Sequence, residues 1–269
     1  MNCLFSIFKK KLIKVICDTN IWYDIAEGRI KKNSFSKYRL HPTYVNLVEL
    51  ARTPNLLHDL SLVQRTVKSL YENNGGIYET NPIEFIIKKQ YPHYRCKDMK
   101  YKSILKFFEK LMQNVNSEVE NSLRNHMRKS IKQYKDDLQK TADSVNDLLP
   151  GIRENIKKTT EKKVHRNKKS LPIFFDIINF FVEEYTKGTI SLDIAKFPWD
   201  EIELFISVWD NYFKELEISP NQKFQSNDWF DLFGMVYVDK DSKYSTSETK
   251  WIRLISKDEN IKSYLLLLN

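Results

Sequence analysis

The sequence of 269 residues contains few of the residues that bend or interrupt a chain, with only 6 glycines and 8 prolines. Beside a charged fraction of 29%, this scarcity predicts a helix-rich protein with few tight turns. Cysteine is equally scarce. Cys3, Cys17 and Cys96 lie far apart without C-x-x-C spacing, so the sequence indicates neither a zinc site nor a disulfide framework.

Long apolar runs are also missing. No run approaches the roughly 18 residues of a membrane-spanning helix, so no membrane association is expected. The apolar residues 3–8 precede Lys9-Lys10-Lys11, which is the reverse of the basic-then-apolar order of a secretory signal. Both features favour a cytoplasmic location. The hydrophobic content of 41% is sufficient for a sizeable core.

Positive charge is present in excess and is unevenly distributed. The formal net charge is +9, from 44 basic and 35 acidic residues. Fourteen basic residues oppose seven acidic ones between Glu120 and Lys169, which leaves +7 on this segment. Such a segment can bind a polyanion or form an ordinary solvated helix face. The candidate nucleic-acid-binding residues within it are Arg124, Arg128, Lys129, Lys162, Lys163, Arg166, Lys168 and Lys169.

Helical patterning dominates the middle of the chain, from about residue 77 to residue 195. Helices are expected at about 103–112, 119–149 and 172–185. Pro150-Gly151 is expected to end the longest of them, because proline cannot donate the backbone hydrogen bond that a helix interior requires.

The segment Val15-Ile16-Cys17-Asp18-Thr19-Asn20 carries the first functional signal. A short apolar run ends in Asp18, and a helix-compatible segment follows over residues 21–27, which predicts a strand that delivers Asp18 to the start of a helix. In open α/β sheets, ligands bind beyond the carboxyl ends of the strands. This segment alone leaves open whether Asp18 takes part in chemistry or only caps the helix.

Further carboxylates follow the same pattern. A helix over residues 43–52, with Thr43 as its cap, carries Glu49. Ser226 or Asn227 can cap a helix whose first turn holds Asp228 and Asp231. A short strand over residues 244–246 then leads to Glu248 at the start of the last helix.

Carboxylates that crowd together repel one another unless a cation neutralises them. Oxygen ligands of this kind suit Mg²⁺ or Mn²⁺, which commonly bridge carboxylates to a substrate phosphate. A bound ion can activate water and stabilise the charge on a phosphoryl group. The sequence therefore predicts metal-dependent phosphodiester hydrolysis. The candidate metal ligands are Asp18, Glu49, Asp228, Asp231 and Glu248.

In four places, in the expected order, the chain resembles the PIN-domain nucleases, many of which are ribonuclease toxins of bacterial toxin-antitoxin pairs. Asp18-Thr19-Asn20 matches the family's Asp-Thr-Asn/Ser after the first strand, and Glu49 matches the carboxylate on an early helix. Asn227-Asp228 matches the Asn-Asp that opens a late helix. The segment Thr246 to Trp251 fits Thr-x-Asp-x-x-Phe, with Glu248 in place of Asp and Trp251 in place of Phe.

The resemblance implies one PIN-like domain over residues 1–269, an α/β three-layer fold with a short, mostly parallel central sheet. Its core segments would be about 13–55 and 220–269, with a large helical insertion over about 56–219. It also implies a ribonuclease that uses Mg²⁺ or Mn²⁺ to hydrolyse single-stranded RNA, with RNA favoured over DNA. A catalytically inactive nucleic-acid-binding or regulatory module is the alternative. The resemblance leaves open whether the protein binds an antitoxin or another protein partner, and whether it forms a homodimer.

The roles that the resemblance implies fall on particular residues. The catalytic residues would be Asp18, Glu49, Asp228 and Glu248, with Thr19, Asn20 and Thr246 in support. Asp231, one helical turn after Asp228, is a second candidate for the third ligand. We expect Asp228 to outweigh Asp231, because it follows the helix cap, where the helix dipole favours an anion.

Overall fold

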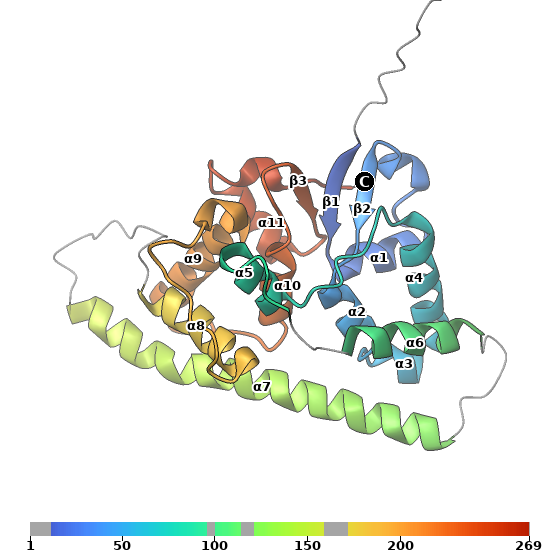
Figure 1. Cartoon of the computed structure of the whole chain (residues 1–269), viewed down its shortest axis with the longest axis horizontal. Coiled ribbons are helices and arrows are strands. Elements are labelled where there is room, and N and C mark those ends of the chain that lie inside the picture. Colours follow the sequence, from blue (N-terminus) through green and yellow to red (C-terminus); the bar gives the residue numbers. More distant parts are fainter. Residues whose placement is uncertain (1–11, 96–99, 114–120, 159–171, 269) are drawn as a thin grey trace, which may run out of the picture.

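A three-stranded parallel sheet lies at the centre of the computed structural model, which describes residues 12–95, 100–113, 121–158 and 172–268 (Figure 1). Its strands are β1 (Ile13–Cys17), β2 (Tyr38–His41) and β3 (Ser242–Ser245), in the order β2-β1-β3. Val15 pairs with Leu40 on one side and with Lys243 on the other. The predicted α/β class with a short parallel sheet is confirmed.

Both faces of the sheet are covered by helices, because side chains alternate between the two faces of a strand. Ile16 packs into one hydrophobic cluster, while Val15 and Cys17 pack into another. The first cluster includes α5 (Pro82–Gln90), α8 (Pro172–Thr186), α9 (Glu203–Ile218), α10 (Asp228–Met235) and α11 (Thr249–Ser256). The second includes α1 (Thr19–Ala26), α2 (Tyr44–Leu50), α3 (Asn55–His58), α4 (Leu60–Asn73) and α6 (Lys100–Gln113).

Four helices begin close to the carboxyl edge of the sheet. Helix α1 follows β1 directly and is capped by the Asp18 side chain. Helix α2 follows β2 and begins with a capping box between Thr43 and Asn46. Helix α11 starts shortly after β3, and α10 contacts α2. Because parallel strands end at the same edge, residues far apart in the chain are brought together there.

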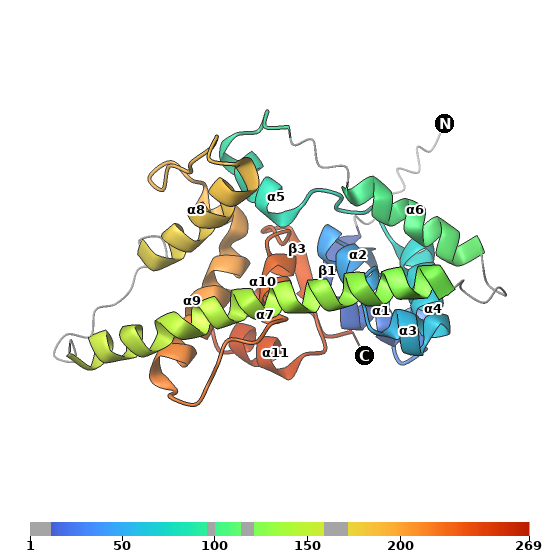
Figure 2. The same ribbon diagram turned by 90° about the horizontal axis from the view of Figure 1, so that it is seen from below.

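Helix α7 (Asn121–Lys158) runs across the sheet-flanking helices from one end of the molecule to the other (Figures 1 and 2). The expected break at Pro150-Gly151 is wrong, since the helix continues to Lys158. Proline removes one backbone hydrogen bond, and packing on both sides of it offsets that loss. Leu149 is buried before the proline, and Arg153 is anchored to another helix after it.

The contact between α7 and the end of α9 centres on Arg153. Its guanidinium donates hydrogen bonds of 2.8–3.1 Å to the backbone carbonyls of Leu216, Ser219, Pro220 and Gln222. The last carbonyls of a helix have no partner within the helix and carry partial negative charge. Arg153 therefore caps α9 from outside. Among the described residues, no helix is long and apolar enough to cross a membrane.

Replacing Arg153 with Gln is expected to lower the free energy of unfolding by about 2 kcal/mol, because several charge-assisted hydrogen bonds to carbonyls are lost. Chemical denaturation would measure the difference. Lys132→Gln, at an exposed position of the same helix, removes a positive charge without these bonds and should have little effect. Equal stability of the two variants would contradict the capping role of Arg153.

Candidate metal centre

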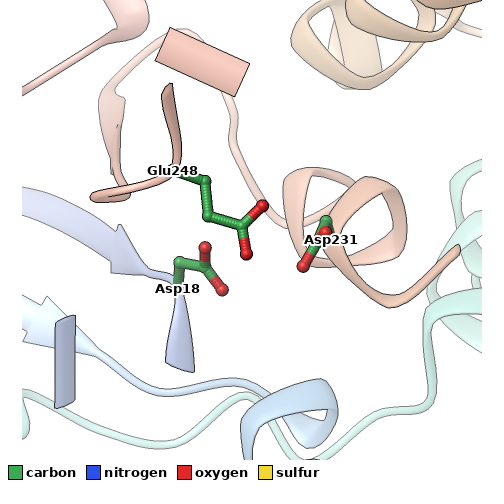
Figure 3. A group of neighbouring side chains, drawn as sticks. All are labelled: Asp18, Asp231 and Glu248. Carbon is green, nitrogen blue, oxygen red and sulfur yellow. The ribbon is translucent and has the colours of Figure 1, made fainter. Parts of the chain in front are cut away.

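Three carboxylates converge at the carboxyl edge of the sheet: Asp18, Asp231 and Glu248 (Figure 3). Each offers a ligand oxygen, and these oxygens all lie within 4.8 Å of one another. Asp18 follows β1, Asp231 lies in the first turn of α10, and Glu248 immediately precedes α11. Three separate segments therefore build one acidic group.

Asp18 is held by both of its carboxylate oxygens. The backbone N–H of Thr19 donates to Oδ1 at 2.6 Å, and the Thr246 hydroxyl donates to Oδ2 at 2.7 Å. The Asp18 backbone N–H donates to the carbonyl of Ser245 at 2.8 Å, which joins the ends of β1 and β3. Asp18 thus caps α1 and also belongs to the acidic group, so the two interpretations of its sequence are compatible.

Glu248 is positioned by two of the expected supporting residues. Its backbone N–H donates to the Thr246 hydroxyl oxygen at 3.1 Å, and the Asn20 side-chain amide donates to its carboxylate at 3.5 Å. Thr246 therefore contacts both Asp18 and Glu248. The loop after β3 fixes the separation of these two carboxylates.

Glu49 lies beside this group and is linked to it through Thr19. The Thr19 hydroxyl donates to the Glu49 carboxylate and accepts a hydrogen bond of 2.9 Å from the side-chain amide of Asn46. Burial and the neighbouring charge of Asp18 raise the pKa of Glu49 to about 8. Glu49 lines the same cavity as the three carboxylates, as the sequence predicts, but is not one of the three convergent ligands.

Asp231, and not Asp228, lies with the other carboxylates, although the sequence favoured Asp228 as the third ligand. Asp228 accepts hydrogen bonds from the Tyr212 hydroxyl and from the backbone N–H of Gln225, and it forms an ion pair with Lys250. It is buried by these contacts and does not line the cavity. Asp231, and not Asp228, lies beside Asp18 in the acidic group.

Helix geometry accounts for this difference. Asn227, Phe230 and Asp231 line the cavity, and their i, i+3, i+4 spacing puts them on one face of α10. Successive residues are about 100° apart around a helix axis, so the Asp228 side chain is turned by about 100° from that of Asn227. It therefore lies off the face of α10 that lines the cavity. Burial of Trp229 and Leu232 in the core fixes this rotation of the helix.

Burial and neighbouring negative charges raise the pKa of two of these carboxyl groups, those of Asp18 and Asp231. Burial, with a contribution from the charge of Glu248, raises the pKa of Asp18 to about 6. Burial and the charges of Asp18, Glu248 and Glu49 raise the pKa of Asp231 well above its usual range. A cation among them would favour the ionised forms.

The donor set fits a hard divalent cation. The three convergent side chains offer only carboxylate oxygens, which suit Mg²⁺ or Mn²⁺ and lack the nitrogen or sulfur donors typical of zinc sites. These cations keep some of their waters and are commonly held by one or two carboxylates together with a substrate phosphate. Asp18, Asp231 and Glu248 are sufficient in number and kind for that mode of binding.

The sequence matches no protein-family model, no curated protein and no solved structure.

The carboxylates open into a cavity of about 350 Å³ whose opposite wall comes from helix α7. Tyr134, Lys135 and Leu138 supply that wall, and Arg52 lies between α2 and α3 on the same rim. Neither Tyr134 nor Arg52 was predicted from the sequence. Arg52 could have been identified from its position three residues after Glu49. No sequence pattern around Tyr134 connects it with Glu49, which lies 85 positions earlier in the chain.

The structure describes only part of the expected nucleic-acid-binding set. Arg128 and Lys129 are exposed on α7. Arg124 lies in α7, but its side chain is outside the description. Outside the described residues altogether lie Lys162, Lys163, Arg166, Lys168 and Lys169.

Without metal, the protein is expected to lose stability as the pH rises from about 4.5 to about 8, in part through Glu49. The pKa of Glu49 is about 8 in the folded state, against 4.5 as its ordinary value. The folded state therefore binds the Glu49 proton more tightly, and its advantage disappears as that proton is lost.

Glu49→Gln should reduce this pH dependence by on the order of 2 kcal/mol. Denaturation in EDTA at several pH values would measure it. Glu72→Gln, at an exposed position of α4, should keep the wild-type profile. If Glu49→Gln also kept that profile, Glu49 would not be the group that titrates.

Proposed function

We propose that this protein is a metal-dependent nuclease of PIN type that hydrolyses phosphodiester bonds in single-stranded RNA. The observation that carries the proposal is the convergence of Asp18, Asp231 and Glu248 at the carboxyl edge of a parallel sheet. Buried like charges destabilise a fold, and a divalent cation offsets that cost. Glu49 adds a fourth carboxylate to the same cavity.

Asp18, Asp231 and Glu248 would hold Mg²⁺ or Mn²⁺. Such an ion, when bound, lowers the pKa of water and stabilises negative charge on a phosphoryl group. The protein's own contribution is orientation. Thr246 holds Asp18 and the Glu248 backbone, and Thr19 holds Glu49, so the carboxylates are fixed before substrate arrives.

The size of the cavity supports a single-stranded substrate. Its 350 Å³ lies at the lower end of the roughly 300–1,000 Å³ typical of pockets for small ligands. A space of this size would admit one nucleotide unit of a flexible strand, whereas a duplex is too wide and too stiff to enter it. The choice of RNA over DNA follows from the resemblance to PIN-domain ribonucleases.

Labelled single-stranded RNA should be cleaved in Mn²⁺ or Mg²⁺ and left intact in EDTA. Asp18→Asn is expected to reduce the rate by about 100-fold or more, because it removes an anionic ligand. The same assay with single-stranded DNA would test the preference for RNA. If RNA is bound but not cleaved with either metal, the alternative of an inactive binding module holds.

Asp231→Asn should reduce cleavage more than Asp228→Asn, at saturating Mn²⁺ and at a temperature where both variants are folded. Asp231 belongs to the convergent group, while Asp228 is occupied by Lys250 and Tyr212. Asp228→Asn should instead lower thermal stability, because it leaves the Lys250 ammonium without its partner. The opposite order of cleavage rates would assign the third carboxylate to Asp228.

Metal binding should be visible without any substrate. A cation that binds only the folded state stabilises it by about 2.7 kcal/mol at one hundred times its dissociation constant. Titration of Mn²⁺ should therefore raise the melting temperature of the wild type and raise that of Asp18→Asn much less. In EDTA, Asp18→Asn should melt at or above the wild-type temperature, because one buried charge has been removed. A large loss of stability there would make Asp18 a structural cap only.

A further inference from the structure

Arg52 lies at the rim of the cavity. Within the described residues, its guanidinium makes no hydrogen bond or ion pair with a protein group. The guanidinium lies over the ring of Tyr134, whose centroid is 4.7 Å from the Arg52 Cζ atom. The side chain is only partly buried, so a ligand can reach it.

Tyr134 provides a firm support for this cation. Its ring packs edge-on against Phe230 of α10, with the ring centroids 5.3 Å apart. Ile131 and Met127 are buried on the same side of α7, one turn and two turns earlier than Tyr134. The Tyr134 ring thus extends from α7 and packs against α10, and Arg52 lies against the ring in a cation–π interaction.

Other cations continue from this rim along α7. Lys135 lines the cavity beside Tyr134 and is exposed. Lys132 and Arg128 are also exposed, and their spacing of three and four residues from one to the next puts all three on one face of the helix. A row of positive charges therefore approaches the acidic group from one side.

We propose that Arg52, positioned by Tyr134, and Lys135 form a phosphate-binding subsite that receives the backbone of a polynucleotide strand next to the carboxylate group. The inference rests on the proposed function for its substrate class. A strand whose scissile phosphate lies at the carboxylates has neighbouring phosphates about one nucleotide away, and these need cations of their own. Arg52 offers a planar donor group suited to phosphate oxygens.

The arrangement also explains why an arginine rests on an aromatic ring here. A free arginine side chain loses conformational entropy when it binds phosphate. Packing against Tyr134 restricts the guanidinium beforehand, so less entropy is lost on binding. Since Arg52 follows α2, which carries Glu49, while Tyr134 belongs to α7, the subsite also couples the long helix to the acidic group.

The test is the binding of a fluorescent single-stranded oligoribonucleotide in EDTA, so that cleavage does not interfere. Arg52→Gln should weaken binding about tenfold, as expected for loss of a charge-assisted hydrogen bond. The slope of log affinity against log salt should fall by about 0.7, because one phosphate contact is lost. Arg65→Gln is the matched control: this arginine is exposed on α4 and lines a different cleft, and its removal should change neither quantity.

Tyr134 is tested as a positioning residue. Tyr134→Leu should weaken binding several-fold with the salt slope retained, because the charge of Arg52 is still present but less well oriented. Tyr134→Phe keeps the ring and should restore wild-type affinity. If Phe behaves like Leu, the ring contact is not what positions Arg52, and that part of the proposal is overturned.

These measurements separate this inference from the proposed nuclease activity. If the wild type cleaves RNA but Arg52→Gln binds with the affinity and salt slope of Arg65→Gln, the subsite is overturned and the nuclease proposal stands. If the wild type shows no cleavage with either metal but Arg52→Gln weakens binding as expected, the subsite stands and the nuclease proposal fails. No binding of the oligoribonucleotide by the wild type would overturn the subsite.

Discussion

The hydrogen bond from the Asp18 amide to the Ser245 carbonyl is the contact on which the acidic group depends. It extends the parallel pairing of β1 and β3 by one residue, to the point where both strands end. Asp18 is consequently held beside the loop that contains Thr246 and Glu248. Had the strands been antiparallel, their carboxyl ends would lie at opposite edges of the sheet, and these residues would be far apart.

The protein retains carboxylates in surroundings that disfavour their charge. Asp18 and Asp231 are buried, and burial raises the pKa of both. Fixed hydrogen bonds compensate in part, since Thr19 and Thr246 donate to Asp18. Buried carboxylates of this kind destabilise the fold, and a bound ligand can offset that cost. Perturbed pKa values therefore cluster at functional sites. The same reasoning links stability, pH and the proposed metal binding in this molecule.

Helix α7 joins two roles in one element. Towards its end, Arg153 caps α9 and so fixes the helix to the core, which also explains why the helix tolerates Pro150. In its middle, Tyr134 and Lys135 close one side of the carboxylate cavity. A helix that is anchored elsewhere can present such side chains in a fixed orientation, whereas a surface loop would first have to be ordered.

The sequence by itself determined the local elements and the residues that begin or end them. The apolar run before Asp18 predicted β1, and the pattern around Thr43 predicted α2. The short parallel sheet was implied by the resemblance to PIN-domain nucleases. The sequence also predicted that Asp18 and Glu248 lie close together, because residues that follow parallel strands meet at one edge of the sheet.

Only the tertiary structure decided which carboxylate of α10 joins them. Sequence spacing gives the angle between Asp228 and Asp231 around the helix axis, but it does not give the rotation of the helix against its neighbours. That rotation is set by the packing of Trp229 and Leu232 in the core. The contact of Arg52 with Tyr134 has the same origin, because it joins segments that only the folded chain brings together.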